Sequence, residues 1–132
     1  MKPEDNLKKG SLEMLVLQLL SNHDCYGYQL TQIMKKQSED VIIVPSGFLY
    51  PTLYKLLEKS YISEYPVKSG KRQERIYYHL QAAGVVYLKN QLDAYHNVTN
   101  TIEKILNYTG DGETISLDQA YEKKILTSVE LA

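Results

Sequence analysis

The strongest constraint on the fold is a change in the spacing of apolar residues along the chain. Before residue 60 they recur every three or four positions, which is typical of helices packed on a core. Between residues 61 and 80 they alternate with polar residues, as in β-strands, and from residue 82 to 108 the helical spacing returns. The sequence therefore predicts short helices, then a β-hairpin, and then one long helix.

Two short helices are predicted before residue 40. Ser11 is the expected N-cap of the first helix. Its core-facing stripe consists of Leu12, Leu15, Val16, Leu19 and Leu20. Asp24 is the expected N-cap of the second helix, and Lys35 and Lys36 in its last turn complement the helix dipole. The β-branched segment 41–45 that follows is either a short strand or a buried linker.

A third helix is predicted within the segment PSGFLYPTLYKLLEKSYIS, residues 45–63. We expect it to begin near Ser46 or Gly47, because Pro51 has no N–H group and fits only in an opening turn. Leucines at helical spacing would face the core. The residues left on the outward face are Tyr50, Pro51, Tyr54 and Lys55.

The alternating segment predicts a two-stranded hairpin with a basic tip. Its strands are YISEYPV and RIYYHL, joined by a turn that contains Gly70. Between Ser46 and Arg75 there are six basic residues against three acidic ones, although the whole chain has a net charge of −1. The basic residues at or near the tip are Lys68, Lys71, Arg72 and Arg75. Cations on an exposed loop are suited to phosphate contact.

The long helix has the clearest pattern in the chain. Its apolar residues are spaced three and four apart with one polar member, which indicates a heptad stripe. The members are Val85, Leu88, Leu92, Tyr95, Thr99, Ile102 and Leu106. A helix of this length spans about 40 Å, so the stripe needs a partner, either another segment of this chain or a second copy. Residues 109–132 predict a linker and a short helical or disordered tail, with Ser116 and Gln119 as a capping box.

Several functions find no support in the sequence. No nucleophile elbow, phosphate-binding glycine loop or local carboxylate pair indicates catalysis, so we predict no enzyme and no catalytic residues. His23 and Cys25 are close in sequence, but no cluster supplies four ligands at zinc spacing, so no metal or cofactor is expected. No segment is long and apolar enough for a bilayer, and a single cysteine fits a reducing compartment. We therefore expect a cytoplasmic protein with no membrane partner.

The order of three helices and a hairpin predicts a winged helix-turn-helix fold, mainly α with a small β component. In such a domain the third helix enters the major groove of DNA, and the basic hairpin lies along the backbone or minor groove. We expect the DNA-binding domain over residues 1–80, a dimerisation helix over residues 81–108, and the tail over residues 109–132.

Two segments in particular, GFLYPTLYKLLEKSYI and KSGKRQERIYYHLQAAG, resemble the PadR family of bacterial transcriptional regulators. The earlier segment LVLQLLSNHDCYGYQL also resembles the first two helices of that family. The resemblance covers residues 10 to 108 and implies a homodimeric repressor that binds a palindromic operator in double-stranded DNA. The positions implied for DNA contact are Ser46, Gly47, Tyr50, Pro51, Tyr54, Lys55, Lys68, Lys71, Arg72 and Arg75.

The resemblance also implies a dimer interface. The long helix of each subunit would pack on the other subunit, including the partner's first helix. The positions concerned are Leu12, Leu15, Val85, Leu88, Leu92, Tyr95, Thr99, Ile102 and Leu106. The short tail favours the compact subgroup of the family, which has a single long C-terminal helix.

Two departures from the family pattern affect what can be carried over. Gln81 stands where relatives have a threonine that caps the long helix. Tyr95 aligns with a tryptophan through which drug-binding relatives stack planar ligands, so a small aromatic effector is the ligand implied here. The alternative function is a protein-interaction module that keeps the winged-helix shape without binding DNA.

Overall fold

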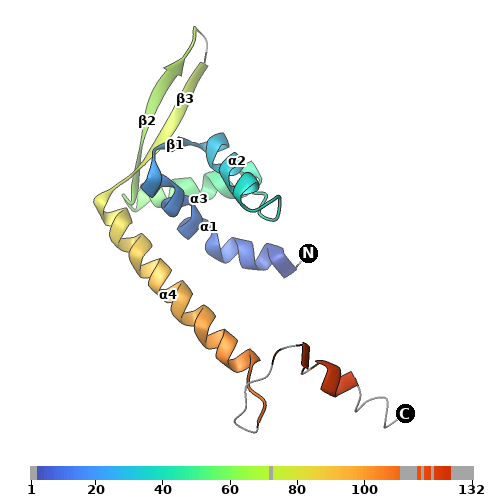
Figure 1. Ribbon diagram of the computed structural model, residues 1–132. Coiled ribbons are helices and arrows are strands. Elements are labelled where there is room, and N and C mark those ends of the chain that lie inside the picture. The colour runs from blue at the N-terminus through green and yellow to red at the C-terminus, as the bar shows by residue number, and fades with distance from the viewer. Residues whose placement is uncertain (1–2, 72, 111–115, 117, 120, 126–132) are drawn as a thin grey trace. The chain divides into compact units, whose positions relative to one another are not determined.

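A computed structural model describes residues 3–71, 73–110, 116, 118–119 and 121–125 of the chain. Figure 1 shows the elements, which confirm the predicted helices, hairpin and long final helix. They are α1 (Pro3–Asn22), β1 (Cys25–Tyr26), α2 (Gly27–Gln37), α3 (Ser46–Glu58), β2 (Ile62–Ser69), β3 (Gln73–Leu80) and α4 (Ala82–Leu106). The order is that of a winged helix-turn-helix domain followed by a long helix.

The sheet has three antiparallel strands in the order β1-β3-β2, one more than the hairpin alone predicts. Strands β2 and β3 pair from Ile62 opposite Leu80 to Ser69 opposite Gln73. The extra strand β1 adds only Cys25, opposite Tyr78, and Tyr26. A strand of two residues has too few positions to show an alternating pattern, so it could not be predicted from residue spacing. Hereafter β2, β3 and their turn are called the wing.

The starts of α1 and α2, and the depth of Pro51 within α3, differ from the sequence predictions. Helix α1 begins at Pro3, and proline suits a helix start because it has no N–H group that would be left without a partner. Ser11 therefore lies inside the helix and is not its N-cap. Helix α2 has Tyr26 as its N-cap in place of Asp24. Helix α3 begins at Ser46, as predicted, and this start places Pro51 in the second turn and not in the opening turn.

Pro51 removes one backbone hydrogen bond from α3. The first N–H of the regular ladder is that of Leu49, which donates to the carbonyl of Pro45 at 3.1 Å. At Pro51 the same pattern would require an N–H directed at the carbonyl of Gly47, which proline cannot supply. Gly47 is exposed, so water can satisfy that carbonyl, and a proline is tolerated one turn deeper than expected.

Segment 41–45 is a linker and not a strand. Its residues form no ladder, and their exposure alternates along the segment. Ile42 and Val44 pack against the core, whereas Val41 and Ile43 are exposed. The linker therefore contributes two side chains to the core between α2 and α3.

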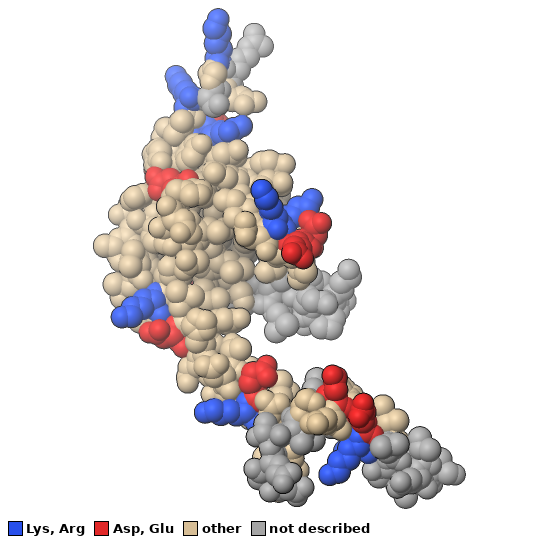
Figure 2. Space-filling model, in the orientation of Figure 1, with Lys and Arg blue, Asp and Glu red and all other residues tan. Residues whose placement is uncertain are grey.

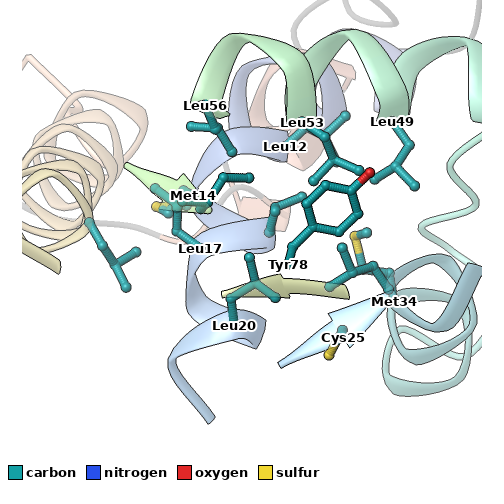
Figure 3. Close-up of a cluster of buried hydrophobic side chains, with 14 residues drawn as sticks. Leu12, Met14, Leu17, Leu20, Cys25, Met34, Leu49, Leu53, Leu56 and Tyr78 are labelled. Carbon is teal, nitrogen blue, oxygen red and sulfur yellow. The ribbon is translucent and has the colours of Figure 1, made fainter. Parts of the chain in front are cut away.

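The core lies between α1, α2, α3 and the inner face of the sheet (Figure 3). Figure 3 shows the ring of Tyr78 directed from β3 toward Leu49 and Leu53 of α3. The most completely buried side chains are Val16, Leu17, Cys25, Leu30, Leu49, Leu53 and Leu56. Leu17 is absent from the predicted stripe of the first helix, and it is buried because α1 contacts both α3 and β3.

The chain divides into two compact units, residues 1–92 and residues 93–132. The first half of α4 belongs to the first unit, where Leu88 is 6% exposed and Leu92 packs against the core. In the second unit the predicted capping box is confirmed. The N–H of Ser116 donates to Gln119 Oε1 at 3.0 Å, and the N–H of Gln119 donates to Ser116 Oγ at 3.2 Å. The predicted domain boundaries at residues 80 and 108 stay predictions.

Candidate DNA-binding surface

Helix α3 packs on the core through one face, and its opposite face is exposed. Leu49, Leu53 and Leu56 are at most 1% exposed and fix the helix to the core. Gly47 and Pro51 lie on the opposite side and are exposed. The helix therefore presents a continuous outward surface with no apolar anchor on it, as a groove-reading helix requires.

Tyr50 and Tyr54 have different surroundings, although they are one turn apart. The hydroxyl of Tyr50 lies over Gly27 of α2, where an added Cβ would be 2.7 Å from that oxygen. Tyr50 is 37% exposed and Tyr54 is 61% exposed. The absence of a side chain at Gly27 thus makes room for Tyr50, whereas the Tyr54 ring projects outward. The two ring centroids are 6.3 Å apart.

A groove of about 670 Å³ separates α3 from the wing. Its wall is rich in tyrosine, which combines an apolar ring with a hydroxyl that can donate or accept a hydrogen bond. The lining residues are Tyr26, Gly27, Tyr28, Tyr50, Tyr54, Glu64, Gln73, Glu74, Arg75, Ile76 and Tyr78. Tyr28 of α2 is 65% exposed and is the lining residue that our sequence reasoning missed most clearly.

The basic residues of the wing fall into two groups. Lys68 and Lys71 are exposed toward its tip, where Figure 2 shows lysine and arginine gathered. Arg75 is half-buried, and its guanidinium carbon lies 4.4 Å from the ring centroid of Tyr26. This cation–π contact holds Arg75 at the groove in a restricted orientation. Arg72 lies outside the described residues.

Lys55 makes an ion pair inside its own chain. Its Nζ atom is 2.9 Å from Glu13 Oε1 of α1, and its side chain is 56% exposed. The hydrogen bond to Glu13 raises the pKa of Lys55, so the ammonium stays charged. The DNA contact predicted for Lys55 stays a prediction.

A polar cluster at the base of the wing joins three parts of the fold. Tyr65 of β2 donates its hydroxyl to Asp24 Oδ2 at 2.6 Å, and His79 Nδ1 of β3 is 2.8 Å from Asp24 Oδ1. The hydrogen bond from Tyr65 lowers the pKa of Asp24, and the contact with His79 adds to this effect. These residues are far apart in sequence, so no local pattern could have indicated the cluster.

A metal centre and a membrane span are not evident in the described part of the chain. No group of three or more histidine, cysteine or acidic side chains there could hold a metal ion. None of the described helices combines the length and apolar character of a membrane span. Burial raises the pKa of the Cys25 thiol to about 11, which makes it a poor nucleophile.

An exposed helix face beside a tyrosine-lined groove and a wing with a basic tip defines a winged-helix DNA-binding protein. The Transcriptional regulator PadR-like family matches residues 16–90 of the sequence. The chain belongs to this family.

Relatives and solved structures agree with this assignment. A PadR family transcriptional regulator from Eggerthella lenta superimposes with a TM-score of 0.71 at 25% identity, over 79% of this chain and 88% of that one. A PadR-like regulator from Bacillus cereus gives a TM-score of 0.68 at 26% identity, over 79% and 99%. Transcriptional regulator YqjI of Escherichia coli is 33% identical over 64 residues, which are 48% of this chain and 31% of YqjI.

Family and fold together identify a DNA-binding transcriptional regulator. This family and this fold are those of transcriptional regulators and not of enzymes, as the sequence predicted.

Proposed function

We propose that the chain is a homodimeric repressor that reads a palindromic operator with α3 and holds the DNA backbone with its wing. The observation that carries this proposal is the outward face of α3, where Tyr54 projects beside the groove while the leucines hold the helix. Ser46, Gly47, Pro51 and Tyr54 would lie nearest the base edges. Tyr50 would contact DNA with the exposed part of its side chain, and the buried part would support α3 by packing on α2.

The wing would supply the electrostatic part of the binding. Lys68, Lys71 and Arg72 would contact phosphates at the tip, and Arg75 would do so from the groove wall. Each phosphate contact releases counterions, so affinity should depend steeply on salt. The net charge of −1 does not oppose this role, because the tip concentrates cations locally.

Dimerisation would use the exposed apolar residues of α4. Those in the second unit form a stripe at helical spacing, here called the α4 stripe: Tyr95, Val98, Ile102, Ile105 and Leu106, which are 47–69% exposed. The margins of the dimer interface would be formed by Leu15, Val85, Leu92 and Thr99. Leu12 and Leu88 are already buried in their own core, so they would support the interface from beneath. Tyr95 would stack on a small aromatic effector that relieves repression.

The test is binding of a fluorescent DNA duplex across a salt series, with a sequence selected from random duplex DNA serving as the operator and an unrelated sequence for comparison. The double variant Lys68→Ala with Lys71→Ala should weaken binding to both sequences. Its plot of log affinity against log salt should be shallower by about 0.9 for each phosphate that the variant no longer neutralises. The matched control is Lys89→Ala with Lys104→Ala, which removes the same charge from α4. Equal slopes in the two double variants would exclude Lys68 and Lys71 from phosphate contact.

A further inference from the structure

A single carboxylate on α1 bonds to both of the helices on which the proposed function depends. Glu13 Oε1 is 2.9 Å from Lys55 Nζ of α3. Glu13 Oε2 accepts a hydrogen bond from the Tyr87 hydroxyl of α4 at 2.7 Å, and Gln91 Nε2 donates to the same hydroxyl at 2.7 Å. Each oxygen of Glu13 is therefore engaged by a different helix.

The surroundings of this network restrict its movement. The Glu13 side chain is only 23% exposed, so its carboxylate is shielded from water on most sides, whereas the Lys55 side chain is 56% exposed. Partial burial acts to raise the pKa of Glu13, but the hydrogen bonds from Lys55 and Tyr87 outweigh it and keep the carboxylate ionised. An exposed ion pair contributes little, whereas removing a partner from a half-buried network leaves a charge without compensation.

The ring of Tyr87 extends the network to the end of α3. It stacks on Tyr61 with centroids 4.4 Å apart and planes at 15°. The carbonyl of Tyr61 lies so close to Gly84 of α4 that an added Cβ would collide with it. The start of α4 is thus packed directly on the segment that leaves α3, and Glu13 bonds to side chains of both helices.

We propose that Glu13 is a positioning residue that sets the orientation of α3 relative to α4, and so couples the long helix to operator recognition. This inference rests on the proposed function. Movement of the Tyr87 hydroxyl with α4 changes the bonds available to Glu13 and hence the hold on Lys55. Lys55 then acts on DNA through the orientation of its helix, because its ammonium is bound to Glu13.

The test uses variants that remove single polar groups from the full chain. Tyr87→Phe keeps the stacked ring and removes only the hydroxyl, Glu13→Gln removes the charge, and Tyr121→Phe in the tail is the matched control. Each should be assayed for affinity to operator and to unrelated DNA, and for melting temperature. Both network variants should lose operator affinity by about 3- to 30-fold, with affinity for unrelated DNA and the salt slope unchanged. A purely structural role would lower the melting temperature without changing the ratio of the two affinities.

A charge exchange separates positioning by Lys55 from direct phosphate contact. Glu13→Lys alone should reduce operator affinity, and adding Lys55→Glu should restore part of it, because the ion pair is rebuilt in reverse. If Lys55 instead contacted phosphate, the added Lys55→Glu would weaken binding further and overturn the proposal. Unchanged operator preference in Tyr87→Phe and Glu13→Gln would also overturn it, while leaving the repressor function intact. A wild-type chain with no operator preference would overturn both.

Discussion

At the scale of single residues, Gly27 determines what the two tyrosines of α3 can do. Because no side chain occupies that position, the Tyr50 ring settles on α2, and only 37% of Tyr50 stays exposed. Tyr54 has no such support and is 61% exposed. The sequence showed that both rings lie off the leucine stripe, but it could not show which ring α2 would support, because that depends on how two helices pack.

This difference gives a prediction for two alanine variants. Tyr54→Ala should reduce operator affinity by about 1–3 kcal/mol, as expected when a side chain that reads the groove is removed, with no change in melting temperature. Tyr50→Ala should also lower the free energy of unfolding, by about 1–3 kcal/mol, because it removes a ring packed between α2 and α3. Binding by anisotropy and unfolding in urea measure both effects. A Tyr54→Ala variant with a lowered melting temperature and normal operator affinity would mean that Tyr54 supports the fold and does not read the groove.

Asp24 is the second residue whose role the structure defines. Its carboxylate holds Tyr65 and His79 and thereby ties both wing strands to the segment before α2. The pKa of Asp24 lies below its ordinary value of 3.8, chiefly because Tyr65 donates to it. A carboxyl with a lowered folded-state pKa stabilises the fold above its unfolded pKa and loses this contribution as the pH falls through the folded value.

We therefore predict a pH-dependent cost for Asp24→Asn. At pH 7 the variant should unfold about 1 kcal/mol more easily than the wild type. The difference should shrink as the pH falls below about 4, where the wild-type carboxyl also becomes neutral. Urea unfolding at several pH values measures this difference. A difference that stays constant down to pH 2 would mean that the charge of Asp24 does not stabilise the fold.

At the scale of elements, the sequence predicted the kinds of element better than their starting residues. Apolar spacing indicated the helices and the hairpin because it reflects which face meets the core. Capping patterns failed at Ser11 and Asp24, since α1 continues back to Pro3 and Asp24 bonds to the wing. At Pro51 the error came from local reasoning, because an exposed carbonyl tolerates the missing hydrogen bond in the second turn.

Helix α4 shows why a periodic stripe cannot be read as a single surface. The predicted stripe treated its members alike, yet Leu88 is 6% exposed and Ile102 is 48% exposed. Leu88 and Leu92 in the first half of the helix pack against the core of the first unit, whereas the apolar residues of the second half are 47–69% exposed. Val98 and Ile105 were missed, although their spacing from Tyr95 and Ile102 also alternates between three and four.

Ile102→Asp tests the α4 stripe directly. A carboxylate at the centre of an apolar interface should raise the dimer dissociation constant about 100-fold or more, because dimerisation would remove the hydration shell of the charge. Asn100→Asp, which adds the same charge beyond the stripe, should leave the dimer unchanged. Sedimentation velocity over a concentration series measures both variants. A stable Ile102→Asp dimer with normal melting would place the interface elsewhere.

At the scale of the whole molecule, contacts between distant residues explain what could not be predicted from the sequence. The basic tip of the wing could be predicted from the sequence because its cations are close together along the chain. The Glu13 network could not be predicted, because Glu13 and Tyr87 are 74 residues apart and meet only when three helices pack. The binding surface could therefore be predicted in outline, and the means of holding it in position could not.

The central claim is that α3 and the wing read a palindromic operator as parts of a dimer. The most direct measurement is selection of binding sites from random duplex DNA, followed by hydroxyl-radical footprinting of the selected sequence. We predict a sequence with dyad symmetry and two protected half-sites about one helical turn apart. With Tyr54→Ala, salt-dependent binding should remain and the preference for the selected sequence should weaken. Selection of no common sequence, or protection without a dyad, would contradict the claim.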